Sequence, residues 1–117
     1  MSSVPVLPLS AIRRTGELVF VSGQLALVEG KITGHDIVTQ TNIVIDAIKR
    51  ELATQGLDLD GVVKTGVWLV SEGDFAAFNA TYARRFAPPY PARSTVVSRL
   101  LIPGALIEID AIARIQS

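Results

Sequence analysis

Hydrophobic residues change their spacing several times along the chain, and each change indicates a different element. A run of β-branched and aromatic residues over 17–22 predicts a strand, and two glycines within 29–34 predict a turn. From 36 to 55 the apolar positions recur at three- and four-residue intervals, which predicts an amphipathic helix ended by Gly56. The stripe of this helix consists of Thr41, Ile45, Ile48 and Leu52.

The second half of the chain predicts strand, helix, strand and strand. The almost continuous apolar segment 62–70 predicts a strand that is buried on both faces. Asp74 is expected to be the N-cap of a second helix, which the proline-rich segment 88–91 ends. Strands are then expected around 93–98 and 105–115, so the order predicts an α+β domain with both helices on one sheet face. The aromatic residues on one face of the second helix are Phe75, Phe78, Tyr82 and Phe86.

The composition indicates one domain that spans residues 1–117. Hydrophobic residues make up 49% and the mean hydropathy is +0.40, so another subunit is expected to cover part of the apolar surface. Charged residues and Pro103 interrupt the apolar C-terminal segment, so no membrane span is expected. The N-terminus lacks the basic and apolar runs of a signal peptide, and we expect a cytoplasmic protein.

Several kinds of chemistry lack the residues that they need. The formal net charge is zero, which argues against a nucleic-acid partner, and the pairs Arg13–Arg14 and Arg84–Arg85 are interpreted as solvated surface. Cysteine is absent, and His35 is the only histidine, so no metal site or Ser-His-Asp triad is expected. No glycine-rich phosphate loop is found either, and we expect no cofactor.

Two charged residues, Arg93 and Glu108, lie in apolar strands near the C-terminus. Their charges are costly to bury unless they pair with each other or with a ligand. Arg93 could pair structurally with Glu108 or Asp110, or its planar fork could bind the carboxylate of an organic acid. Strand alternation places Glu108 on one face with Asp110, where it is either solvated or free to hold a water or move a proton.

Four short motifs in order resemble the RidA family, the YjgF-type reactive-intermediate deaminases. They are Phe-Val-Ser-Gly-Gln at 20–24, Phe-Asn-Ala-Thr-Tyr at 78–82, Pro-Ala-Arg-Ser at 91–94 and Ile-Glu-Ile at 107–109. The resemblance covers the chain from about 8 to 115. It implies a chorismate-mutase-like α+β fold, with a mixed β-sheet and two helices on one face. It also implies a homotrimer with its ligand sites in the clefts between subunits.

The resemblance assigns roles to residues of the C-terminal strands. It implies that Arg93 binds the substrate carboxylate and that Glu108 positions the attacking water. Backbone groups of Ser94 and Thr95 are expected to contact the ligand. Many relatives carry cysteine at the position of Thr95, and a backbone contact tolerates that change.

Further candidates come from earlier in the chain. Ser22 and Gly23 end a predicted strand, where a glycine permits a close backbone approach to a ligand or simply makes a turn. Asn79 is either solvated or part of the pocket. Leu9 departs from the family pattern, because many deaminating relatives have tyrosine in a Pro-Tyr-Ser motif at this place. The missing phenol predicts a more apolar pocket and a bulkier substrate.

The resemblance implies a hydrolytic deaminase of small 2-imino or enamine acids that gives 2-oxo acids and ammonia. The substrate partner is then a small carboxylate. One alternative is a non-catalytic or regulatory protein that binds small carboxylic acids, which Leu9 favours. Another is a deaminase of a larger catabolic intermediate of the 2-aminomuconate type. Ribonuclease activity has been attached to the family, but the neutral charge and single histidine disfavour it here.

Overall fold

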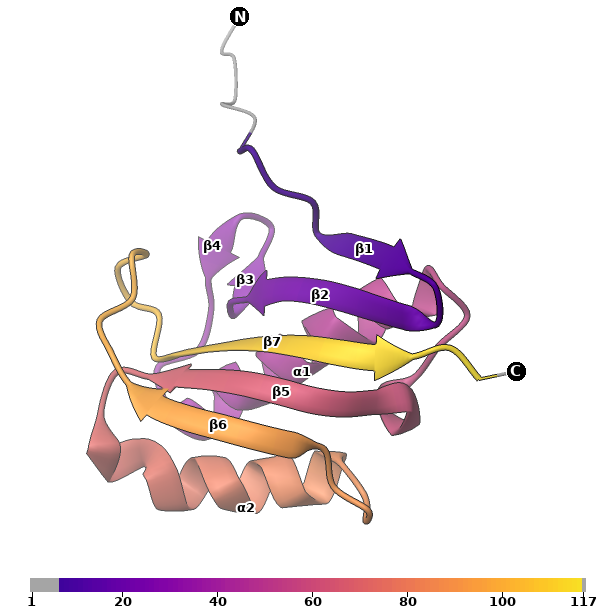
Figure 1. The fold of residues 1–117 in the computed structure, drawn as a ribbon. Coiled ribbons are helices and arrows are strands. Elements are labelled where there is room, and N and C mark those ends of the chain that lie inside the picture. Colours follow the sequence, from indigo (N-terminus) through magenta and orange to yellow (C-terminus); the bar gives the residue numbers. More distant parts are fainter. Residues whose placement is uncertain (1–6, 117) are drawn as a thin grey trace, which may run out of the picture.

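The computed structural model describes residues 7–116 and shows two helices packed on one face of a mixed sheet (Figure 1). The helices are α1 (Ile37–Ala53) and α2 (Phe75–Arg85), with 3₁₀ turns η1 (Leu59–Gly61) and η2 (Glu72–Asp74). The strands are β1 (Ile12–Thr15), β2 (Leu18–Gln24), β3 (Leu27–Val28), β4 (Lys31–Ile32), β5 (Val62–Leu69), β6 (Ala92–Val97) and β7 (Ile107–Arg114). The predicted α+β architecture is confirmed.

The main sheet has the strand order β1-β2-β7-β5-β6, and β3 and β4 form a separate small hairpin. Only β5 and β6 are parallel, because α2 connects them as a crossover. The last strand, β7, is inserted between β2 and β5 and is antiparallel to both. The strand β6 therefore lies at an edge of the sheet, beside α2 (Figure 1).

Burial alternates strictly along β7 and defines the two faces of the sheet. Ile107, Ile109, Ala111 and Ala113 are buried beneath the helices, whereas Glu108, Asp110 and Ile112 are only half-buried. The stripe predicted for α1 faces the same core, since all four of its residues are fully buried. We call the opposite side, which carries Glu108, the open face, because no helix within residues 7–116 covers it.

Burial of β5 on both faces was predicted, and within this chain the prediction is wrong. Val63 and Lys64 are exposed, and Trp68 is half-buried on the open face. The reason is the placement of both helices on one side of the sheet. The apolar residues of β5 therefore indicate a surface that this chain alone does not cover.

The helix ends follow local hydrogen bonds. Asp36 caps α1 by accepting from the Thr39 backbone N–H at 2.7 Å. Gly56 follows the helix with φ +71°, and its N–H donates to the Ala53 carbonyl, as expected for a C-terminal glycine. Asp74 occupies the N-cap position of α2, as predicted, but its side chain makes no capping hydrogen bond. The cap lies one turn earlier, where Ser71 Oγ accepts from the Gly73 N–H, because a 3₁₀ turn precedes the helix.

Candidate functional site

Arg93 projects from β6 toward α2, on the helix-covered side of the sheet. It is paired in register with Thr65, which is fully buried on that side. Arg93 Nη2 donates to Asn79 Oδ1 at 2.7 Å. The guanidinium carbon lies 4.9 Å from the ring centroid of Tyr82 and 5.1 Å from that of Phe78. The cation therefore rests on two aromatic faces, which attract it electrostatically.

The rings beneath Arg93 are themselves held in place. The Tyr82 hydroxyl forms a 2.8 Å hydrogen bond with the buried Thr65 hydroxyl, and Phe86 stacks on the Tyr82 ring at 4.4 Å. Burial raises the pKa of the Tyr82 phenol, so this hydroxyl stays protonated as a hydrogen-bonding group at neutral pH. The position of the Arg93 guanidinium group is thus determined by its packing on the Tyr82 and Phe78 rings.

The free side of Arg93 faces a cavity of about 530 Å³. Its walls are Asn79, Tyr82, Ala83, Tyr90, Pro91 and Arg93. Among residues 7–116, no carboxylate lies within ion-pair distance of Arg93. The bond to Asn79 uses only one of the guanidinium N–H donors, so the others can bind a carboxylate in a bidentate manner.

Glu108 lies on the other face of the sheet. It is paired in register with Trp68, and Asp110 follows on the same face. Partial burial, and to a lesser degree the charge of Asp110, raises the pKa of the Glu108 carboxyl above its usual value. Arg93 and Glu108 are therefore not brought together within one chain. The alternative of a structural Arg93–Glu108 or Arg93–Asp110 pair is wrong for the same reason.

Gly23 makes room for the Glu108 carboxylate. A Cβ atom at Gly23 would collide with Glu108 Oε2. The glycine lies in an irregular part of β2, because Val21 pairs with Ala111 whereas Gln24 pairs with Ile109. The absence of a side chain at Gly23 thus permits a close approach by the carboxylate of Glu108. The approach of a ligand to this glycine stays a prediction. The sequence predicted that the strand ends at Ser22–Gly23, and this is wrong, because β2 continues to Gln24.

Ser22 and Leu9 lie near the first strand. Ser22 Oγ donates to the Ser10 carbonyl at 2.5 Å, and the Ser22 N–H donates to the Ala11 carbonyl at 2.9 Å. The serine hydroxyl therefore ties β2 to the segment that precedes β1. Leu9 directly precedes this contact and is 63% exposed.

Ser94 and Thr95 point to opposite faces of β6. Ser94 lies on the open face opposite Gly66, and Thr95 lies on the helix side opposite Val67. Because β6 pairs only with β5 in the described part of the chain, one of its edges carries backbone groups without a sheet partner there. This edge leaves main-chain N–H and carbonyl groups available to a ligand or a second subunit.

Sequence reasoning missed the aromatic support of Arg93. The sequence places Phe78 and Tyr82 on the hydrophobic face of α2, and both are buried. Their rings also lie beneath the guanidinium group of Arg93. Their spacing of four residues places them one turn apart on the helix and was the available signal. Phe75 belongs to this face only partly, since it is 44% exposed, and its centroid lies 6.0 Å from the guanidinium carbon.

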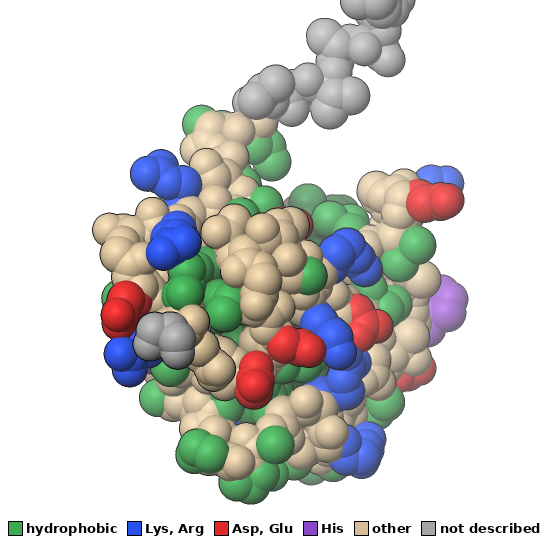
Figure 2. Space-filling model, turned by 90° about the vertical axis from the view of Figure 1, so that its right-hand side faces the viewer, with side chains coloured by type: hydrophobic (Ala, Val, Ile, Leu, Met, Phe, Trp, Pro, Cys, Tyr) green, Lys and Arg blue, Asp and Glu red, His purple; other side chains and the backbone are tan. Residues whose placement is uncertain are grey.

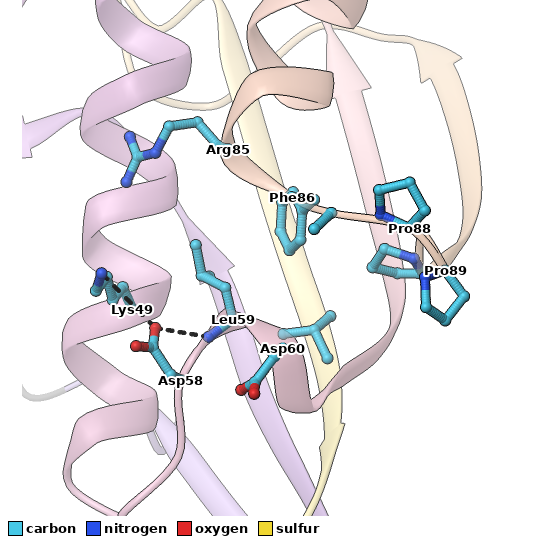
Figure 3. A pocket seen from close by; sticks show the side chains of 11 residues that line it. Lys49, Asp58, Leu59, Asp60, Arg85, Phe86, Pro88 and Pro89 are labelled. Carbon is cyan, nitrogen blue, oxygen red and sulfur yellow. Dashed lines mark hydrogen bonds and ion pairs between the residues drawn. The ribbon is translucent and has the colours of Figure 1, made fainter.

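A second cavity, of about 360 Å³, lies between α1, η1 and the segment that follows α2 (Figure 3). Three of its four charged side chains have partners nearby, and the fourth, Asp60, is exposed. Lys49 lies 3.7 Å from Asp58, which also accepts from the Leu59 N–H, while Arg85 pairs with Asp46 of α1. None of the residues predicted for the site lines this cavity.

The face of the molecule drawn in Figure 2 carries charges of both signs. On the side drawn in Figure 2, Lys and Arg side chains alternate with Asp and Glu. Within residues 7–116, no three His, Cys, Asp or Glu side chains gather as metal ligands. In the same range, no helix has both the length and the apolarity to cross a membrane.

The fold and the site define a small α+β protein in which an arginine side chain faces an open cavity. The chain belongs to the family described as Endoribonuclease L-PSP, whose model matches residues 2–115, and the resemblance to RidA and YjgF proteins is confirmed. A RutC family protein of Pyrococcus horikoshii is 38% identical over 111 residues, which cover 93% of this chain and 88% of that protein.

Two further relatives carry the RidA name. The chloroplastic protein Reactive Intermediate Deaminase A of Arabidopsis thaliana is 38% identical over 108 residues, covering 91% of this chain and 58% of that protein. The crystal structure of RidA from an Antarctic Psychrobacter species superimposes with a TM-score of 0.88 at 31% identity, covering 96% of this chain and 92% of that chain.

Proposed function

We propose that the protein is a hydrolytic deaminase of small 2-imino acids and their enamine tautomers, with a 2-oxo acid and ammonia as products. The observation that carries the proposal is the guanidinium group of Arg93. It packs on aromatic rings and is oriented by its hydrogen bond to Asn79. It has no acidic partner among the described residues, and it faces a cavity. This arrangement suits a bidentate contact with a carboxylate.

The complete site requires two subunits. Glu108 lies on the face opposite Arg93, so an acid bound at Arg93 would meet the Glu108 carboxylate of another subunit. The half-exposed apolar residues of the open face, such as Phe20 and Trp68, support an association that covers this face. A homotrimer, as in the RidA family, provides such clefts, and the edge of β6 then offers the backbone of Ser94 and Thr95.

The reaction needs only water as co-reactant. Glu108 accepts a hydrogen bond from water and takes its proton as the oxygen adds to the C=N carbon. That proton passes to the imine nitrogen, which gives a carbinolamine. Glu108 then takes the hydroxyl proton and delivers it to the amine nitrogen, so that the C–N bond breaks, the C=O bond forms and ammonia leaves. An imine is already electrophilic, so orientation and a modest proton transfer suffice. The raised pKa of Glu108 brings this carboxylate nearer the range in which it can both accept and return a proton.

The second candidate function is that of a non-catalytic protein that binds small carboxylic acids. Leu9 favours it, because leucine cannot offer the hydroxyl that tyrosine provides in many deaminating relatives. This protein would retain the Arg93 cavity and bind 2-oxo acids without turning over imines.

One pair of measurements separates the two candidates. Imino acids are generated by an amino-acid oxidase in the presence of the protein, and the rate of 2-oxo acid formation is followed. Calorimetry with pyruvate then reports binding alone. The deaminase predicts turnover that falls in Arg93→Ala and Glu108→Gln but not in the control Arg50→Ala, an exposed position on α1. Binding without any turnover in the wild-type protein would establish the second candidate instead.

A further inference from the structure

The cavity beside Arg93 has room for much more than a carboxylate. Its volume is about 530 Å³, and the walls away from Arg93 are Ala83, Tyr90, Pro91 and the ring of Tyr82. Two polar atoms of the nearer wall are already engaged, since Asn79 Oδ1 accepts from Arg93 and the Tyr82 hydroxyl bonds to Thr65. Away from Arg93, this chain offers the body of a ligand two tyrosine rings, a pyrrolidine ring and one methyl group, with the Tyr90 hydroxyl and the Asn79 amide as polar groups.

Tyr90 is presented on a stiff segment. Pro89 precedes it and Pro91 follows it, which restricts the backbone on both sides of the tyrosine. The side chain is 50% exposed, although aromatic side chains usually bury most of their area. A rigid ring with a free face beside a cavity is preorganised to contact a ligand, because little conformational entropy is lost on binding.

Ala83 lies on the last part of α2 and also lines the cavity. Its methyl group leaves the space between the helix and Tyr90 open. A larger residue at this position would project into that space, whereas Ala80, which is also exposed on α2, does not line the cavity.

We infer that the acid bound at Arg93 carries an aromatic side chain, and that Tyr90 and Ala83 determine this specificity. The inference rests on the proposed function for the carboxylate contact and adds the substrate class. An aryl group can stack in an offset manner on Tyr90 and lie against Pro91. An aliphatic group of equal area lacks the ring–ring contribution, which corresponds to about two- to tenfold in affinity.

Calorimetry with two stable 2-oxo acids, pyruvate and phenylpyruvate, tests the inference. Wild-type protein is expected to bind phenylpyruvate at least roughly tenfold more tightly than pyruvate, since the phenyl ring leaves water and meets Tyr90. Tyr90→Ala should remove most of this preference and leave pyruvate binding intact, while Tyr90→Phe should retain the preference. Ala83→Leu should weaken the binding of phenylpyruvate but not that of pyruvate. Ala80→Leu should leave the affinity for both acids unchanged.

The inference is overturned if wild-type protein binds both acids equally, or if the preference survives in both Tyr90→Ala and Ala83→Leu. Should Tyr90→Ala fail to fold, the matched pair Ala83→Leu and Ala80→Leu decides the matter alone. Arg93→Ala separates this inference from the proposed function. If Arg93→Ala binds neither acid and the wild type shows no preference for phenylpyruvate, the carboxylate contact is supported. Only the aromatic specificity is then refuted. Unchanged binding of both acids in Arg93→Ala removes the carboxylate contact itself.

Discussion

Arg93 and Glu108 project from opposite faces of the same five-stranded sheet. Arg93 is in register with the buried Thr65 on the helix side, whereas Glu108 is in register with Trp68 on the open face. No rotation of either side chain carries it through the sheet. A reaction that uses both groups therefore takes them from two copies of the chain.

Subunit mixing tests this relationship directly. The purified protein is expected to scatter light as a particle of about three times the 12.5 kDa chain mass. Arg93→Ala and Glu108→Gln should each be inactive. When the two variants are unfolded together and refolded, mixed trimers regain sites with both groups intact. Random mixing restores about a quarter of the wild-type sites, because each mixed ring contains one complete cleft.

Two outcomes would contradict the shared site. A monomer at micromolar concentration would remove the cleft altogether. Trimers that mix, as shown by exchange of a tag, but regain no activity would place both groups in one subunit or exclude one of them from catalysis.

Replacing Arg93 is expected to weaken acid binding. Arg93→Ala should lose about 2 to 4 kcal/mol of binding free energy for a 2-oxo acid, since a bidentate charge-assisted contact disappears. Arg93→Lys should recover only part of this binding free energy. An ammonium group lacks the planar fork and cannot pack on the rings of Tyr82 and Phe78 as the guanidinium group does. Calorimetry measures both variants. Equal affinity of the lysine variant and the wild type would show that charge alone matters.

Glu108→Gln is expected to change the pH dependence of stability. The pKa of Glu108 is raised in the folded state, so the charged form destabilises the fold at pH values above that pKa. Below the ordinary value of 4.5 the carboxyl is protonated in both states and the penalty is absent. Glu108→Gln should therefore raise Tm at pH 7 and have little effect on Tm at pH 4. Thermal unfolding at the two pH values checks this, and an equal effect at both would assign the change to packing instead.

Gly23→Ala is expected to displace the Glu108 carboxylate. The added Cβ would collide with Glu108 Oε2, so the glutamate must take another rotamer. We expect turnover to fall together with stability, while binding of a 2-oxo acid at Arg93 falls less. Gly73→Ala is the matched control, because its added Cβ would have Ser71 Oγ at an ordinary 3.5 Å as its nearest contact. Wild-type turnover in Gly23→Ala would show that the rotamer of Glu108 is not critical.

Leu9→Tyr is expected to change substrate size preference. The hydroxyl of tyrosine could contact the smallest imino acid, whereas leucine favours longer or branched side chains. One buried methylene contributes about 0.8 kcal/mol, so two or three could shift the preference roughly ten- to fifty-fold. The ratio of kcat/KM for a short and a branched imine is compared in both proteins. Identical ratios would mean that Leu9 does not shape specificity.

Local patterns in the sequence were sufficient for both helices and for the strands β2, β5, β6 and β7, whereas β1 and the short hairpin of β3 and β4 were not predicted. The stripe of α1, from Thr41 to Leu52, and the alternation around Glu108 repeat with the periods of a helix and a strand. These periods depend on neighbouring residues only, so they are visible in the sequence by itself. The unusual cost of a charge in an apolar strand likewise distinguishes Arg93 and Glu108 from the residues around them.

The relation between those two residues was decided by the tertiary structure alone. Alternation says which residues of one strand share a face, but it does not say how that face aligns with the face of another strand. The pairing of β5 with both β6 and β7 makes this alignment, and it places Arg93 over α2 and Glu108 on the open face. The failed prediction for β5 has the same origin, because hydrophobicity indicates that a surface is covered and does not indicate by which chain. The contact of Arg93 with the rings of Phe78 and Tyr82 also depends on the packing of α2 against the sheet, which brings together residues far apart in the sequence.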